Sequence, residues 1–173
     1  MSVTCTLFDE SWSIASGHVT AVCAPAHAWG LLKPQLSDVS WALASEQLVF
    51  PPHTTVSHWL FCYGHMRGVS RRDMQRRVPF LCRYFLLNEH SQLGQLSDKQ
   101  SWLLGCVMGL LVQPQLMVLQ QTTCLPDEDR GKLARLIQQL LPAMAWWVIG
   151  PEHTWLPGLS VNRHIEWSAA CTI

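Results

Sequence analysis

Apolar residues along the chain form two kinds of pattern, short continuous runs and helically spaced stripes. Residues 19–24, 116–119 and 146–149 are apolar runs, as expected of strands buried on both faces. Residues 56–66, 70–87, 101–111 and 128–141 instead show the spacing of buried or amphipathic helices. This alternation of strands and helices predicts an α/β fold with a mostly parallel sheet.

The helix predicted over residues 70–87 has two different faces. Its apolar stripe consists of Met74, Val78, Leu81 and Phe85, and Ser70 is the expected N-cap, with Asp73 three positions later. The other face, with Arg67 just upstream, is cationic and holds six of the twelve Lys and Arg residues: Arg67, Arg71, Arg72, Arg76, Arg77 and Arg83. Such a face is either an ordinary solvated surface or a docking surface for an acidic partner or lipid headgroups.

Composition narrows the class of protein. A chain of 173 residues is long enough for one domain, and its 49% hydrophobic content excludes disorder. Only 14% of residues are charged and the formal net charge is zero, which disfavours a general nucleic-acid binder. A surface this poor in charge, with nine tryptophans in the chain, favours a protein that works with a partner.

Targeting and metal signals are weak. The longest apolar runs, 102–112 and 140–150, have eleven residues each and are too short to span a bilayer. The first residues show no secretory signal pattern, so we expect a cytoplasmic protein. Seven cysteines without a C-x-x-C pair predict no disulfide framework, and the spacing of His53, His58 and His65 predicts no metal site.

Several motifs, in a fixed order, resemble the ATPase domain of ABC transporters. LSDKQ at 96–100, the following helix and QPQLMVLQQTT at 113–123 resemble the family's signature, helix and Walker B strand. Residues 11–33 resemble its Walker A segment, and residues 49–78 resemble the start of its helical subdomain. Gln47 falls at the Q-loop glutamine and Asp127 at the D-loop aspartate, and Ser97 and Gln100 keep the signature residues.

The resemblance covers nearly the whole chain and implies a single domain, 1–173. That domain would have a RecA-like P-loop NTPase core over 1–48 and 101–173 and a helical subdomain over about 49–100. The stretch between Ala24 and Gln47 is too short for the family's antiparallel β-subdomain. We therefore expect a truncated member that lacks most of that subdomain and also lacks the first family strand.

Departures from the family pattern fall on the residues that carry the chemistry. Gly30 and Leu31 replace the Walker A Lys and Ser, which bind phosphate and Mg²⁺. Gln120 and Gln121 replace the Walker B Asp and the catalytic Glu, and a neutral amide cannot take a proton from water.

Two further departures accompany them. In the signature, Asp98 and Lys99 replace two glycines, and the switch histidine, His153, is displaced by one residue because Glu152 occupies its place. The resemblance therefore implies a chain without ATP or Mg²⁺ cofactors and without ATPase activity.

Three functional hypotheses remain open. The preferred one is an inactive ABC-ATPase-like subunit, peripheral at the inner face of a membrane, that binds a membrane-spanning transport or secretion subunit, an intact ABC ATPase or a second copy of itself. The arginine-rich helix would be its docking face. One alternative is an enzyme, either an unorthodox nucleotidase or a subunit whose LSDKQ segment completes a partner's ATP site in an export system. The other alternative is a soluble structural adaptor.

Overall fold

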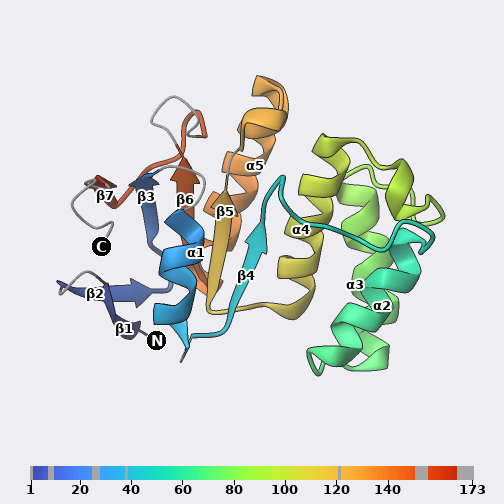
Figure 1. The fold of residues 1–173 in the computed structure, drawn as a ribbon, viewed down its shortest axis with the longest axis horizontal. Coiled ribbons are helices and arrows are strands. Elements are labelled where there is room, and N and C mark those ends of the chain that lie inside the picture. Colours follow the sequence, from blue (N-terminus) through green and yellow to red (C-terminus); the bar gives the residue numbers. More distant parts are fainter. Residues whose placement is uncertain are drawn as a thin grey trace. The chain divides into compact units, whose positions relative to one another are not determined.

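The computed structural model describes residues 2–7, 10–24, 28–37, 39–120, 122–150 and 156–166. The chain divides into two compact units, Met1–Trp41 with Gln115–Ile173, and Ala42–Pro114. The first unit contains most of the sheet, and the second is largely helical (Figure 1). We describe each unit separately.

A five-stranded sheet is the centre of the α/β architecture, in the order β4-β5-β6-β3-β7. Its strands are β3 (Val19–Cys23), β4 (Trp41–Ala44), β5 (Leu116–Gln120), β6 (Ala145–Gly150) and β7 (Arg163–Glu166). The pairs β3–β6, β5–β6 and β3–β7 are parallel, which confirms the predicted fold class. The described residues also hold a separate antiparallel pair, β1 (Ser2–Leu7) with β2 (Glu10–Ala15).

The central strands are buried, as continuous apolar strands in a parallel sheet must be. Every residue of β5 and β6 is buried, and Trp146 on β6 is among the largest side chains that are fully enclosed. Helix α5 (Asp127–Leu140) adds Leu133, Ala134, Leu136 and Ile137 to this core. The predictions for 19–24, 116–119, 146–149 and 128–141 are confirmed to within one residue at each end.

Register places the carboxyl ends of the parallel strands at one edge of the sheet. Cys23 at the end of β3 pairs with Gly150 at the end of β6, and Gln120 at the end of β5 pairs with Ile149. In open α/β sheets, ligand sites form outside this edge. The residues that follow β3 and β5 are therefore the first candidates for function in this unit.

Three helices build the second unit: α2 (Val56–Met66), α3 (Arg71–Tyr84) and α4 (Asp98–Val112), which pack on one another (Figure 1). Helices α2 and α3 approach closely at Gly64, where an added Cβ would lie 2.7 Å from the Met74 sulfur. Trp59 of α2 donates its indole N–H to the sulfur of Met108 on α4, at 3.4 Å. Helix α4 is apolar on nearly every side, and residues 102–107 are all buried.

Some predicted details of these helices change in the structure. The helix predicted over 101–111 begins at Asp98, because Ser97 caps it three residues earlier than the apolar run suggests. On α3, Met74 and Val78 are buried as predicted, but Leu81 is half-buried and Cys82 takes the inward position beside it.

Several short elements were not predicted. They are β1, β2, β4, β7 and the five-residue helix α1 (Ala28–Leu32). The expectation that the first family strand is missing is wrong, because two strands, β1 and β2, precede β3. Between Ala24 and Trp41, the described residues hold only α1 and the 3-10 turn Lys33–Leu36, so the antiparallel β-subdomain does not occur there.

Candidate functional site

The segment after β3 carries the positions that resemble Walker A. Ala24 is buried directly after the strand, and α1 then begins at Ala28, with residues 25–27 outside the described part of the chain. Gly30, at the position of the phosphate-binding lysine, lies in α1, and an added Cβ there would meet nothing within 4 Å. Leu31, at the position of the Mg²⁺-binding serine, is also part of α1. Neither Gly30 nor Leu31 has a side chain that can bind phosphate or a cation.

Two tryptophans, one buried and one half-buried, pack together at this segment. Trp29 is only 7% exposed and contacts Trp41 edge-to-face, with 5.1 Å between the ring centroids. Lys33, the next lysine along the chain, holds its Nζ 5.6 Å from the Trp41 ring, a cation–π distance. The segment is therefore organised around aromatic packing. Sequence reasoning missed this cluster, because Trp41 is twelve residues away in a strand that was not predicted.

The carboxyl end of β5 carries the first of the Walker B positions. Gln120 is 1% exposed, so its neutral amide lies at the enclosed edge where the family has a Mg²⁺-binding carboxylate. Thr122, two residues later, is fully buried, and Gln121 lies outside the described residues. Glu152 and His153, at the switch position, lie outside them too. An amide at this edge can hold a hydrogen bond, but it supplies no negative charge for a divalent cation.

The start of α4 carries Ser97 and Gln100, the two residues that resemble the family signature. Their side chains form a reciprocal capping box in which the Ser97 Oγ accepts from the Gln100 N–H at 3.3 Å. The Gln100 Oε1 in turn accepts from the Ser97 N–H at 3.0 Å. Asp98, at the first helical position, is exposed and adds a favourable negative charge to the helix N-terminus. Both retained residues thus have a structural role in α4.

Asp127, at the predicted D-loop position, and Gln47, at the predicted Q-loop position, are both exposed and lie in different units. Asp127 starts α5 and forms an ion pair with Arg130 one turn along the same helix. Gln47 lies in the turn after β4 and donates its backbone N–H to the Ser45 Oγ at 3.1 Å. Each has a local role in its own segment.

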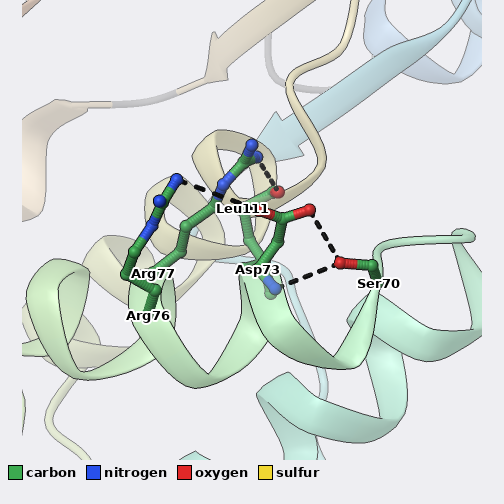
Figure 2. A network of polar contacts seen from close by, with 5 residues as sticks. All are labelled: Ser70, Asp73, Arg76, Arg77 and Leu111. Atoms are coloured by element: carbon green, nitrogen blue, oxygen red, sulfur yellow. Dashed lines mark hydrogen bonds and ion pairs between the residues drawn. The ribbon is translucent and has the colours of Figure 1, made fainter.

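The cationic face predicted on α3 is present, and its beginning is tied into a polar network (Figure 2). The Ser70 Oγ accepts from the Asp73 N–H at 3.1 Å and donates to the Asp73 carboxylate at 2.7 Å, which confirms Ser70 as the N-cap. Arg76 lies 3.9 Å from the Asp73 carboxylate. The hydrogen bond from Ser70, followed by the charges of Arg77, Arg76 and Arg72, lowers the pKa of Asp73.

The arginines of this face have different surroundings. Arg77 reaches across to α4 and donates to the Leu111 carbonyl at 3.2 Å, so it joins two helices (Figure 2). Arg67 caps the end of α2 with its backbone N–H. Arg71, Arg72 and Arg83 are exposed, and none of the three forms a hydrogen bond or ion pair with another described residue.

Arg71 and Arg72 occupy the first two positions of α3, where the helix dipole is positive. Positive side chains at a helix N-terminus weaken the helix, and only Asp73 in that turn offsets them. These two arginines therefore act against the stability of the element that carries them.

An exposed apolar cluster at the other end of α3 was not predicted. Phe80, Tyr84 and Leu86 are 65%, 47% and 83% exposed. Phe80 and Tyr84 lie four residues apart with ring centroids at 6.4 Å, and Tyr84 also contacts the buried Phe85 at 5.2 Å. The signal was available, because the helical period that turns Phe85 inward turns Phe80 and Tyr84 to the arginine side.

In the described part of the chain, no three or more His, Cys, Asp or Glu residues lie close enough together to hold a metal ion. One pair is close: the Cys62 sulfur lies 3.6 Å from the His58 Nε2 on the exposed side of α2. Cys82 is buried and its burial raises the pKa of the thiol to about 12, so it stays protonated at neutral pH. None of the described helices is long and apolar enough to cross a membrane.

Comparison with known proteins identifies the fold. No family model matches the sequence, and no curated protein matches it. Among solved structures, an ATP-binding subunit of an ABC transporter aligns with a TM-score of 0.72 at 18% identity, over 85% of this chain and 73% of that one. The fold is that of an ABC transporter ATP-binding subunit.

Two more structures agree with this fold. An ABC transporter ATP-binding protein from Pyrococcus furiosus has a TM-score of 0.71 at 16% identity, covering 95% of this chain and 98% of that one. The cbiO1 protein of Clostridium perfringens, described as part of the ABC transporter complex cbiONQ, has a TM-score of 0.62 at 13% identity, over 85% and 72%. At these identities the likeness concerns the fold alone.

Proposed function

We propose that this chain is an inactive ABC-ATPase-like subunit that works by binding a membrane transport or secretion complex at its cytoplasmic face. The observation that carries the proposal is Gln120, a neutral amide enclosed at the carboxyl end of β5. A Mg²⁺-dependent ATPase needs a carboxylate there to hold the cation. Replacing it with an amide weakens both cation binding and the charge stabilisation on which phosphoryl transfer depends.

The segment after β3 supports the same proposal. Phosphoryl transfer in P-loop ATPases relies on a lysine amine that reaches the phosphates and on backbone N–H groups that approach them closely. Gly30 supplies no amine, and the nearest lysine along the chain, Lys33, lies over the Trp41 ring. Trp29, within this segment, is buried and packs its indole against Trp41. These features favour a stable scaffold over a nucleotide site.

The proposal also states how the chain binds its partner, which is through the exposed arginines of α3. Arg71, Arg72 and Arg83 leave three guanidinium groups without an ion pair in a chain where only 14% of residues are charged. Exposed arginines of this kind are common anchors of protein interfaces. The expected partners are a membrane-spanning transport subunit, an intact ABC ATPase, or a second copy of this chain. The cbiO1 protein is part of a multi-subunit ABC transporter complex, and we expect an assembly of the same general kind for this chain.

The first experiment measures nucleotide binding by the purified chain with Mg²⁺-ATP, by calorimetry, and hydrolysis by phosphate release. The proposal predicts neither binding at micromolar ATP nor turnover. Mg²⁺-dependent binding that is abolished by a Gln120→Leu substitution would contradict it. A Gln139→Leu variant, altered at an exposed position of α5, is the matched control.

A second experiment concerns the partner and separates the proposal from its alternatives. The tagged chain is purified from gently solubilised membranes of its source cells, and every co-purified protein is identified. A membrane-spanning protein is the expected result, and exclusively soluble partners would favour the adaptor hypothesis. If an ATPase co-purifies, a Ser97→Arg substitution should leave the ATPase activity of the complex unchanged. A loss of activity would favour completion of the partner's ATP site.

A further inference from the structure

Helix α2 carries a thiol and an imidazole in contact on its exposed side. The Cys62 sulfur lies 3.6 Å from the His58 Nε2, and both residues are exposed. They are four positions apart, so their side chains lie on adjacent turns of one helix face. A cysteine thiolate and a histidine nitrogen are both common ligands of Zn²⁺, so the His58–Cys62 pair is a candidate for metal binding.

The separation of the two atoms equals that of two ligands on one tetrahedral ion. In proteins, Zn²⁺ lies about 2.3 Å from a thiolate sulfur and about 2.0–2.1 Å from an imidazole nitrogen. With a tetrahedral angle of about 109° at the metal, these bond lengths place the sulfur and the nitrogen about 3.5–3.6 Å apart. The observed 3.6 Å therefore suits a single ion bound by both atoms.

The opposite side of α2 holds the backbone of the pair in place. Leu60 is buried there and lies about 200° around the helix from His58. Gly64, one turn further along, approaches α3 so closely that an added Cβ would lie 2.7 Å from the Met74 sulfur. Because this inward side is tightly packed, the helix that presents the His58–Cys62 pair is formed before any ion binds, which lowers the entropic cost of binding.

Cys62 is the exposed thiol among the cysteines that the structure describes. Cys82 and Cys106 are buried, and Cys23 and Cys124 are half-buried. A metal ion binds the thiolate form of cysteine, and burial opposes that form by raising the pKa of Cys82 to about 12. Of these five thiols, the one beside an imidazole is therefore also the one that an ion in solution can reach.

We propose that His58 and Cys62 form a two-ligand site for a divalent ion of the Zn²⁺ type, with water in the remaining positions. The Cys62 thiol releases its proton to solvent as the metal–sulfur bond forms, and the His58 Nε2 supplies its lone pair. The sulfur ligand disfavours Mg²⁺ and Ca²⁺, which prefer oxygen. Two ligands bind more weakly than four, so we expect a Kd of about 1–100 µM. The site does not depend on the proposed loss of ATPase function.

A second exposed histidine, His65, provides a matched control. It lies three positions after Cys62 on the same helix, but the contact of the Cys62 sulfur is with His58. His65 does not complete a group of three ligands in the described part of the chain. The proposed site therefore consists of two residues, and His65 is not one of them.

The test adds Co²⁺, and then Zn²⁺, to the purified full chain, with a phosphine reductant to keep the thiols reduced. Co²⁺ bound through a thiolate shows a charge-transfer band in the near ultraviolet. The proposal predicts a band that saturates at one Co²⁺ per chain and disappears when Zn²⁺, which binds such ligands more tightly, displaces the cobalt. No band at up to about 1 mM Co²⁺, or a band that Zn²⁺ does not remove, would overturn the proposal.

Three single variants assign the ligands. Cys62→Ser should abolish the charge-transfer band, because that band needs a thiolate on the metal. His58→Ala should weaken Co²⁺ binding at least about tenfold, because it removes one of two ligands. His65→Ala should bind Co²⁺ as the parent does. A band that survives Cys62→Ser, parent-like binding by His58→Ala, or an equal loss in His65→Ala would each overturn the proposal.

Thermal melting separates metal binding from folding. Residues four positions apart share a face only when the helix is formed, so Zn²⁺ should bind the folded chain more tightly and raise the melting temperature of the parent. Both ligands are exposed, so Cys62→Ser and His58→Ala should melt within about 2 °C of the parent when no metal is present. Zn²⁺ should leave the melting temperature of Cys62→Ser unchanged. A rise in this variant equal to that of the parent would overturn the proposal.

Discussion

The carboxyl end of β5 and the exposed face of α3 differ in the charge and the burial of their polar side chains. At β5, the one described position of those predicted as Walker B holds a neutral amide that is 1% exposed. On α3, charged side chains accumulate on the surface, and two of them oppose the dipole of their own helix. The described end of β5 therefore carries a neutral side chain, whereas two arginines of α3 lie where they weaken their own helix. This contrast is the basis of the proposal that the exposed arginines of α3 serve recognition of a partner.

The largest expected effect comes from placing charge at the enclosed end of β5. Gln120→Glu should lower the free energy of unfolding by about 3–5 kcal/mol, because it removes an ionised carboxylate from water at a position that is only 1% exposed. It should not create Mg²⁺-dependent ATP hydrolysis. Denaturant unfolding and phosphate release measure the two outcomes.

The pH dependence of the effect and a control variant make this prediction specific. Burial raises the folded-state pKa of the new carboxyl above its unfolded value, so the destabilisation is full at neutral pH and fades as the pH falls through that raised pKa. The exposed control Gln139→Glu should change stability by less than about 0.5 kcal/mol. Equal losses of stability at positions 120 and 139, or a gain of Mg²⁺-dependent ATPase activity in Gln120→Glu, would contradict this prediction.

A smaller effect is expected at the start of α4, where the retained signature residues cap the helix. Ser97→Ala should cost about 1 kcal/mol of stability, because it removes the acceptor for the Gln100 N–H. Ser97→Asp keeps an acceptor at the same place and should restore most of the loss. Thermal melting of the two variants decides the matter, and an alanine variant as stable as the parent would refute a capping role.

The smallest effect concerns the N-cap network of α3. The folded-state pKa of Asp73 is lowered, with the Ser70 hydrogen bond as the largest cause, so the ionised carboxylate stabilises the fold at pH values above its unfolded pKa. This contribution is lost as the pH falls through the lowered folded-state pKa. Asp73→Asn should therefore be less stable than the parent near neutral pH and equally stable in acid. A stability difference that does not change with pH would contradict the network.

Much of the fold was predictable because its central elements are long or continuously apolar. Residues 116–119 and 146–149 have no polar residue to interrupt them, and only buried strands or helices tolerate that pattern. The short elements were harder to predict. Helix α1 has five residues and no periodicity to recognise, and β4 has four residues that alternate only between buried and half-buried.

The candidate site was predictable only in part. The order of motifs along the chain located Gln120 at the end of a strand, and the S-x-x-Q spacing at Ser97 is itself a capping-box signal. Burial of Gln120 and the inward position of Trp29 depend on packing between segments distant in sequence. The bond from Arg77 to the Leu111 carbonyl likewise depends on how α3 packs against α4. Local sequence patterns do not specify such contacts.

The most direct test of the central claim reverses the charge at the start of α3. In Arg71→Glu with Arg72→Glu, the new carboxylates complement the helix dipole, so each substitution should stabilise the fold by about 0.3–1 kcal/mol. The same double variant should no longer capture the membrane partner. Melting temperature and partner yield are measured on the same preparation, with Gln75→Glu as the control. A higher melting temperature with capture abolished is the predicted result, and undiminished capture would contradict a recognition role for this face.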